Sequence, residues 1–143
     1  MKIVIGASIE GVELKNELVS ELKKSGFEVL DVSNEGDKDF YDASIKVTNE
    51  VLKDINNNKG IIIDEFGSGS FMVADKFKYI ICAQLNDEHS AKMTRDHNNA
   101  NVITMGSGVI GSDVAKRIAH RFAEAKYSGG RHQIRVDMLN KMC

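Results

Sequence analysis

The stretch IIIDEFGSGS, residues Ile61–Ser70, indicates a buried strand that runs into a glycine turn and then into a helix. A short run of β-branched residues is typical of a strand covered on both faces, and glycine permits the tight turn that follows it. Open α/β folds bind their ligands at such turns, beyond the carboxyl ends of parallel strands. The stretch therefore predicts both a fold class and one edge of the molecule where chemistry can take place.

Short apolar runs alternate with amphipathic segments along the rest of the chain. Strands are expected at residues 2–6, 28–32, 60–64, 79–83 and 101–105, and helices at residues 11–24, 40–52, 70–76, 87–96, 112–125 and 131–141. This alternation predicts parallel strands joined by right-handed crossovers. We therefore expect an α/β fold with three layers, a Rossmann-like open sheet of five parallel strands with helices on both faces. Residues 1–143 are expected to form a single domain.

Composition and charge exclude several classes of function. Nineteen basic residues stand against 21 acidic ones, which gives a net charge of −2, and neither sign forms a long run. This balance argues against nucleic acid and an anionic membrane surface as partners. No apolar run approaches the length of a membrane span, and the two cysteines, Cys82 and Cys143, suggest neither a disulfide framework nor a metal cluster. We expect a soluble, cytoplasmic protein.

The glycine turn after the central strand has two possible roles. Gly67–Gly69 could present backbone amides to an anion, because the N–H groups at the start of a helix lack partners within the helix. Asp64 or Glu65 could act as a general base in a partly dry cleft. Alternatively, Asp64 accepts hydrogen bonds from the amides of the turn while Glu65 faces water, and this second interpretation is preferred because no partner for a base is evident.

The segment RDHNNAN, residues Arg95–Asn101, places a histidine at the end of a helix. His97 and the amides that follow it are suited to moving a proton on a sugar ring oxygen. A histidine in this position can also interact with the helix dipole alone. The neighbouring amides favour the functional interpretation.

The segment GGRHQIR, residues Gly129–Arg135, opens the last predicted helix with two arginines. Arg131 and Arg135 are one helical turn apart, so both can grip one phosphate with forked hydrogen bonds. A solvated helix face is the alternative. The double glycine lets the chain approach a ligand or a partner closely, which favours binding.

Two segments, Arg95–Val102 and Gly129–Val136, together with the early turn at Gly6, resemble the family of type B ribose-5-phosphate isomerases and galactose-6-phosphate isomerases. The resemblance covers essentially the whole chain, and residues 64–74 and 127–143 are most similar to galactose-6-phosphate isomerase subunits. It implies the interconversion of an aldose and a ketose, both phosphorylated, through an enediol or enediolate, without a metal or other cofactor. It also implies an extended C-terminal helix that is used in subunit contacts.

The resemblance assigns roles to four residues. His97 would open the sugar ring, and Asn98 would bind sugar oxygens or the enediolate. Arg131 and Arg135 would hold the phosphate of the sugar-phosphate substrate. Each of these residues matches the pattern of the family.

Departures from the family pattern are equally informative. Family members that are active without a partner subunit have Asp-His after the first strand, where this chain has Ser8 and Ile9. At the position of their catalytic cysteine this chain has Asp64, and at the position of their active threonine it has Phe66. In this family the active site lies between subunits. The resemblance therefore implies a hetero-oligomer whose homologous B subunit carries the cysteine, and which interconverts D-galactose 6-phosphate and D-tagatose 6-phosphate in bacterial lactose and galactose breakdown.

Two alternatives stay open at this point. The chain could be a self-contained pentose- or hexose-phosphate isomerase that uses Asp64 or Glu65 as its base. It could also be a sugar-phosphate-binding subunit with no catalytic role.

Overall fold

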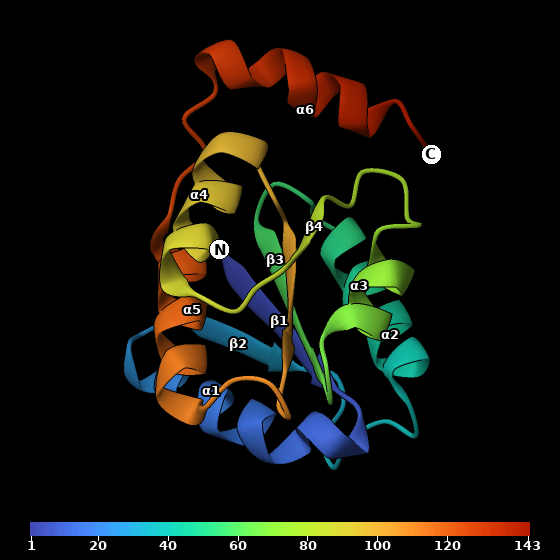
Figure 1. The fold of residues 1–143 in the computed structure, drawn as a ribbon, viewed down its shortest axis with the longest axis vertical. Helices are drawn as coiled ribbons and strands as arrows, with labels where there is room; N and C mark the ends of the chain where they lie inside the picture. The colour runs from blue at the N-terminus through green and yellow to red at the C-terminus, as the bar shows by residue number, and fades with distance from the viewer.

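Five parallel strands form one sheet in the computed structural model, which describes residues 1–143 (Figure 1). The strand order is β2-β1-β3-β5-β4, with β3 at the centre. The strands are β1 (Lys2–Ala7), β2 (Glu28–Asp31), β3 (Asn58–Asp64), β4 (Cys82–Gln84) and β5 (Val102–Gly106). Because all strand pairs are parallel, their carboxyl ends share one edge of the sheet and their amino ends share the other.

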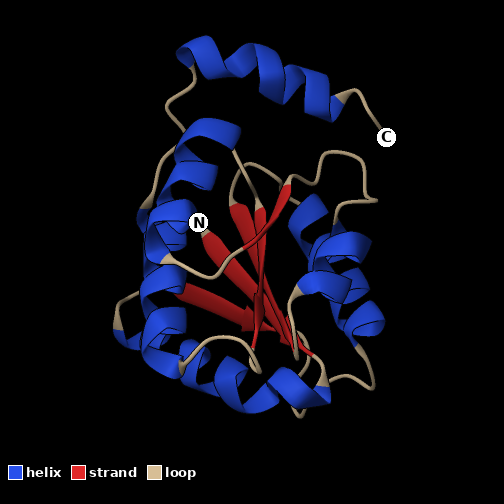
Figure 2. Ribbon diagram, in the orientation of Figure 1, coloured by secondary structure: helices blue, strands red, loops and turns tan.

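Helices cover both faces of the sheet, as Figure 2 shows. The helices are α1 (Val12–Lys24), α2 (Phe40–Leu52), α3 (Ser68–Ala74), α4 (Glu88–Asn98), α5 (Ser112–Glu124) and α6 (Gln133–Asn140), with short 3-10 turns η1 (Ile9–Gly11) and η2 (Gly130–His132). One face carries α1, α4 and α5, and the other carries α2 and α3. The predicted three-layer fold is confirmed.

Side-chain alternation along the central strands builds the two halves of the core. Ile61 and Ile63 of β3 pack in the cluster beneath α1 and α5, whereas Ile62 between them packs beneath α2 and α3. Successive residues of a strand point to opposite faces, so a continuous apolar run serves a sheet that is covered on both sides. This is the physical reason that the isoleucine run predicted the fold.

Most elements begin or end a residue or two away from their predicted ranges, and the differences at β4 and α4 have a clear structural cause. The fourth strand begins at Cys82 rather than at Tyr79, because Tyr79 has φ 68° and Ile80 N–H donates to Phe77 O in a turn. An extended strand does not accommodate a left-handed residue. Helix α4 continues past Asp96 to Asn98, where Asn99 ends it with φ 55°. His97 is therefore a helical residue.

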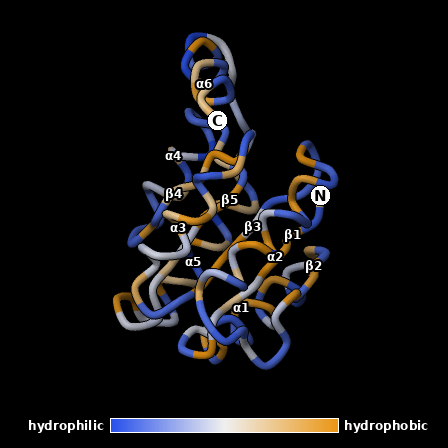
Figure 3. Tube along the Cα trace, turned by 90° about the vertical axis from the view of Figure 1, so that its right-hand side faces the viewer, coloured by the Kyte–Doolittle hydropathy of each residue, from blue (hydrophilic) through white to orange (hydrophobic).

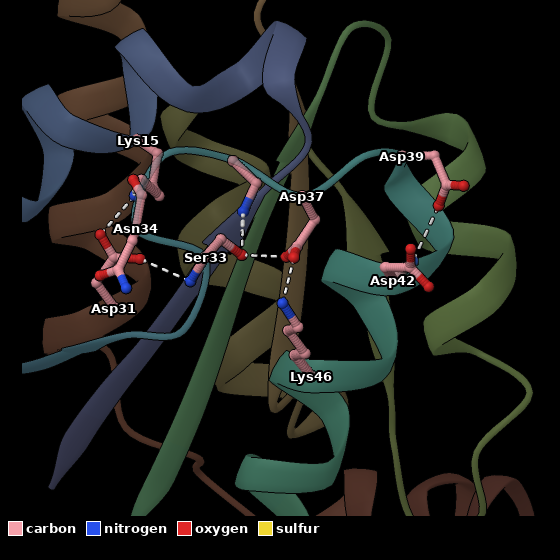
Figure 4. Close-up of polar contacts among 9 residues, drawn as sticks. Lys15, Asp31, Ser33, Asn34, Asp37, Asp39, Asp42 and Lys46 are labelled. Carbon is pink, nitrogen blue, oxygen red and sulfur yellow. Dashed lines mark hydrogen bonds and ion pairs between the residues drawn. The ribbon is translucent and has the colours of Figure 1, made fainter.

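The connection between β2 and α2 is held against the end of β1 by buried polar contacts (Figure 4). Lys15 of α1 is fully buried and donates to Asp31 Oδ2 at 2.5 Å. Ser33 Oγ accepts the Ala7 N–H at 3.1 Å and donates to Asp37 Oδ2 at 2.6 Å. These contacts fix the backbone beside the carboxyl edge of the sheet.

A second buried lysine closes the end of α5. Lys59 Nζ donates to the carbonyl oxygens of Phe122, Ala123 and Ala125 at 3.1–3.2 Å. These carbonyls lack partners within the helix, and a cation beside them also opposes the negative end of the helix dipole. Burial, followed by the positive charge of Arg95, lowers the pKa of Lys59 to about 8.

Helix α6 stands at one end of the molecule, beyond the end of α4 (Figure 3). Val136 is its only buried residue. Four large apolar side chains of this segment are exposed, namely Ile134, Met138, Leu139 and Met142. The predicted C-terminal helix is thus present, with large apolar side chains exposed on its surface. No helix in the chain has the length and apolar character that crossing a membrane requires.

Candidate functional site

A cavity of about 460 Å³ lies at the carboxyl edge of the sheet, beside the glycine turn. Ser8 after β1 and the residues from Asp64 to Gly69 after β3 contribute to its wall. These are the positions where the sequence departs from the pattern of self-sufficient enzymes. The side chains of this cavity therefore determine whether the turn can bind or transform a substrate.

Asp64 accepts hydrogen bonds from the turn that follows it. Its Oδ1 accepts Gly67 N–H at 2.5 Å and Ser70 Oγ–H at 3.1 Å, and its Oδ2 accepts Ser70 N–H at 3.3 Å. Gly67 has φ 80°, a left-handed conformation that glycine adopts without strain. Two amides at the start of α3, those of Gly67 and Ser70, thus face the carboxylate of the chain itself. The preferred interpretation of Asp64 from the sequence is confirmed, and Glu65 is exposed as expected.

The remaining side chains of this cavity are poorly suited to a phosphate. Glu10, Asp39 and Glu65 add to the charge of Asp64, and Lys38 is the only cation in the wall. The hydroxyl of Ser8, and then the backbone N–H of Glu10, lower the pKa of the Glu10 carboxyl, which keeps it ionised. An acidic wall repels a phosphate dianion.

Phe66 occupies the rim of the same cavity. Its ring is 59% exposed, and it offers neither a proton nor a hydrogen bond. Cys82 cannot replace the missing thiol, since it lies on β4 and is buried. Burial, followed by the negative charge of Asp75, raises the pKa of the Cys82 thiol, so it remains protonated and unreactive.

His97 lies at the opposite edge of the sheet. It belongs to the last turn of α4, and β5 begins only a few residues later at Val102, so the histidine lies near the amino end of that strand. Arg95 shares this last turn and donates to Ala100 O at 3.1 Å. The end of α4 is thereby anchored to the start of β5, which gives the histidine a rigid support.

The ring of His132 stacks on the ring of His97. Their centroids are 4.3 Å apart and the ring planes differ by 13°. His132 belongs to η2, directly after the double glycine. His132 lies within the segment GGRHQIR, where no role was predicted for it, and its position between two arginines was the available signal.

Hydrogen bonds from Ser128 to a backbone carbonyl of α4 hold the η2 segment against that helix. Ser128 N–H and Oγ–H both donate to Asp96 O, at 3.0 and 3.1 Å. Gly129 and Gly130 follow with φ 64° and 58°, consecutive left-handed conformations that other residues adopt only with strain. The double glycine therefore lets the chain turn sharply and bring His132 onto His97.

The two arginines and Asn98 lie on the same segments as this histidine pair. Arg131 belongs to η2 and Arg135 to α6, and both are exposed, as is Asn98. Burial, and then the positive charges of His97, Arg131 and Arg135, lower the pKa of His132 against the opposing charge of Asp96. The four residues predicted for the site thus gather at the amino edge, far from Asp64 and Phe66.

Known proteins resemble the chain in sequence and in structure. Residues 3–139 match the profile of the family described as Ribose/Galactose Isomerase. Galactose-6-phosphate isomerase subunit LacA of Lactococcus lactis is 52% identical over 143 residues, and LacA of Streptococcus mutans is 53% identical over 143 residues, with complete coverage of both chains in each case.

Solved structures share the fold over nearly the whole chain. Ribose-5-phosphate isomerase B of Clostridium thermocellum superposes with a TM-score of 0.93 at 35% identity, covering 99% of this chain and 97% of the other. Ribose-5-phosphate isomerase B of Mycoplasma genitalium, solved with bound ribulose-5-phosphate, gives a TM-score of 0.93 at 32% identity and covers 98% and 94%. This chain therefore belongs to the Ribose/Galactose Isomerase family, as its sequence motifs predicted.

Proposed function

We propose that this chain is the A-type subunit of a hetero-oligomeric galactose-6-phosphate isomerase, which interconverts D-galactose 6-phosphate and D-tagatose 6-phosphate. The observation that carries the proposal is the contrast between the two edges of the sheet. His97 and the arginines are exposed or partly exposed at the amino edge, whereas Asp64 closes the turn at the carboxyl edge. One chain offers half of an isomerase site.

His97 opens the sugar ring in this proposal. The protonated imidazole donates to the ring oxygen as the bond between that oxygen and C1 breaks with its electron pair on the oxygen. The hydroxyl at C1 then returns a proton to the imidazole as the carbonyl forms. The last turn of α4 supports this role, because the negative end of the helix dipole stabilises an imidazolium.

Arg131 and Arg135 bind the phosphate. No salt bridge within the chain engages either guanidinium, and both side chains are exposed. Their forked donors therefore remain available to phosphate oxygens. Asn98, which is adjacent to His97 and exposed, binds sugar oxygens or the enediolate with its amide.

The base that moves the proton between C1 and C2 comes from a homologous B subunit that carries a cysteine. Asp64 is unsuited to this role because each of its oxygens already accepts hydrogen bonds from the turn. The relatives in Lactococcus lactis and Streptococcus mutans are named as subunits, which also supports an assembly of different chains.

An activity assay of separate and mixed chains tests the proposal. The purified chain is expected to be inactive on galactose 6-phosphate, and the mixture with a cysteine-bearing B subunit is expected to be active. His97→Ala should abolish activity in the mixture, whereas His89→Ala, on the exposed first turn of α4, is the matched control. Full turnover by the isolated chain would contradict the half-site and point to Glu65, the exposed carboxylate of the turn. Binding of the sugar phosphate without turnover in any mixture would favour the non-catalytic subunit.

A further inference from the structure

The stacked histidines are the feature of the amino edge that the proposed function does not yet explain. The 4.3 Å centroid separation and the 13° angle between planes describe nearly parallel imidazole rings. No hydrogen bond within the chain reaches a ring nitrogen of either histidine, so stacking is the interaction that orients the His97 ring. Catalytic histidines usually depend on a third group to fix their orientation.

The surroundings of the two rings differ in their preference for a proton. His97 lies at the carboxyl end of α4, where the helix dipole favours a positive charge. His132 faces Arg131 and Arg135 from its own segment, and Asp96 from α4, and the pKa of His132 is lowered by burial, by His97 and by the arginines, in spite of Asp96. A proton on the His132 ring is therefore opposed by like charge.

We propose that His132 is a positioning residue, whose neutral ring stacks on His97 and holds it in the orientation that opens the sugar ring. The inference rests on the proposed role of His97. The double glycine and the contact of Ser128 with Asp96 serve this arrangement, because they deliver His132 to the face of His97. The charges around His132 disfavour a proton on its ring, which leaves the ring that stacks on His97 neutral.

Proton NMR titration of the isolated full chain tests the pairing without any need for activity. The ring protons of the four histidines are followed with pH, and His89 and His120 serve as internal references. We expect the pKa of His132 to lie below the ordinary value of a histidine, and His97→Phe to raise that pKa, since the neighbouring charge is removed. An unchanged His132 titration in His97→Phe, or a His132 pKa at or above the ordinary value of a histidine, would overturn the pairing.

Kinetics of the mixed complex test the positioning role. His132→Ala removes the stacked ring and is expected to lower kcat on the closed-ring sugar on the order of 10- to 100-fold, as misplacement of a catalytic group does. KM should change little, because the arginines remain. His132→Phe restores a flat ring without a titratable nitrogen and should recover most of kcat near neutral pH; His89→Phe is the control.

The outcomes separate this inference from the proposed function. If the wild-type mixture does not isomerise galactose 6-phosphate, the proposed function fails, and the NMR titration still decides whether the histidines are coupled. If the mixture is active and His132→Ala keeps its kcat, the positioning role is refuted. A loss that His132→Phe does not recover also refutes it, because His132 would then act through its nitrogens. Near-UV and far-UV circular dichroism of each variant confirms that the fold is retained.

Discussion

Replacing Asp64 with alanine removes the acceptor of three hydrogen bonds at the turn between β3 and α3. Gly67 N–H, Ser70 N–H and Ser70 Oγ–H all donate to this buried carboxylate. A hydrogen bond to a charged group contributes about 1.5–3 kcal/mol, and the contributions of adjacent bonds are not additive. We expect Asp64→Ala to lower the free energy of unfolding by about 3 kcal/mol.

Asp64→Asn is the finer form of the same test. The asparagine keeps Oδ1, which can still accept Gly67 N–H and Ser70 Oγ–H, but its Nδ2 group faces the Ser70 N–H as a second donor. One contact is lost rather than three, so we expect a loss of about 1–1.5 kcal/mol. Glu65→Ala, at the exposed neighbouring position, is the control and should change stability by less than about 0.5 kcal/mol.

Urea denaturation and thermal melting measure these differences. For a chain of this size 1 kcal/mol corresponds to roughly 2–4 °C in Tm, so Asp64→Ala should melt about 6–12 °C lower than wild type. The mixed complex is then assayed with Asp64→Asn. A variant that is as stable as wild type but inactive would refute the structural role of Asp64 and identify it as the base.

Three further predictions concern other parts of the chain. The pKa of Lys59 is lowered to about 8 from an ordinary value of 10.5, so between these pH values the unfolded chain binds more protons than the folded chain, and the contribution of Lys59 to stability rises with pH. The free energy of unfolding of the wild type minus that of Lys59→Met should therefore increase from pH 8 to pH 10.5. A difference that does not change with pH would contradict this prediction, and Lys116→Met is the control. Asp39 accepts Asp42 N–H at 3.0 Å as the N-cap of α2, so Asp39→Ala should cost about 1 kcal/mol in chemical denaturation, and Asp39→Asn should restore most of it. Arg131→Gln and Arg135→Gln should each raise KM for galactose 6-phosphate in the mixed complex by about 10-fold or more in a steady-state assay. Arg117→Gln is the control and should leave KM unchanged.

The fold followed from the sequence because its signals are local and strongly periodic. The isoleucine run predicted the central strand, and Asp39 and Asp87 mark the starts of α2 and α4 as N-caps in the structure. The predicted start of β4 was wrong because Tyr79 adopts a left-handed conformation. Tyrosine carries no local signal for that conformation, which is set by the turn from Phe77 to Ile80.

The site was predicted less completely, since its geometry depends on contacts between distant segments. Asp64 accepts bonds from residues up to six positions away, so its structural role could be anticipated from the turn alone. The stack of His132 on His97 joins residues 35 positions apart, and it depends on the contact between Ser128 and Asp96. Spacing along the chain carries no information about such a contact, although the histidine between two arginines indicated where to look.

The separation of the two edges bears on how many chains complete one site. Asp64 pairs in register with Gly106, at the carboxyl end of β5, and Gly60 pairs with Val102 at its start. Four residue steps of about 3.3 Å place these ends about 13 Å apart, and His97 lies beyond the start of β5. A general acid or base must come within about 3 Å of the proton it transfers. If His97 has the role proposed above, a base at position 64 of the same chain lies too far away to serve the same sugar, and the proposal therefore requires a second chain to supply the base. If the partner chain has this fold with a cysteine at the turn, a pair of one chain of each kind has two sites. One site combines His97 of this chain with the cysteine of the partner, and the other contains Asp64 and Phe66 of this chain. Such a pair holds one working site, and its second cavity is free to diverge.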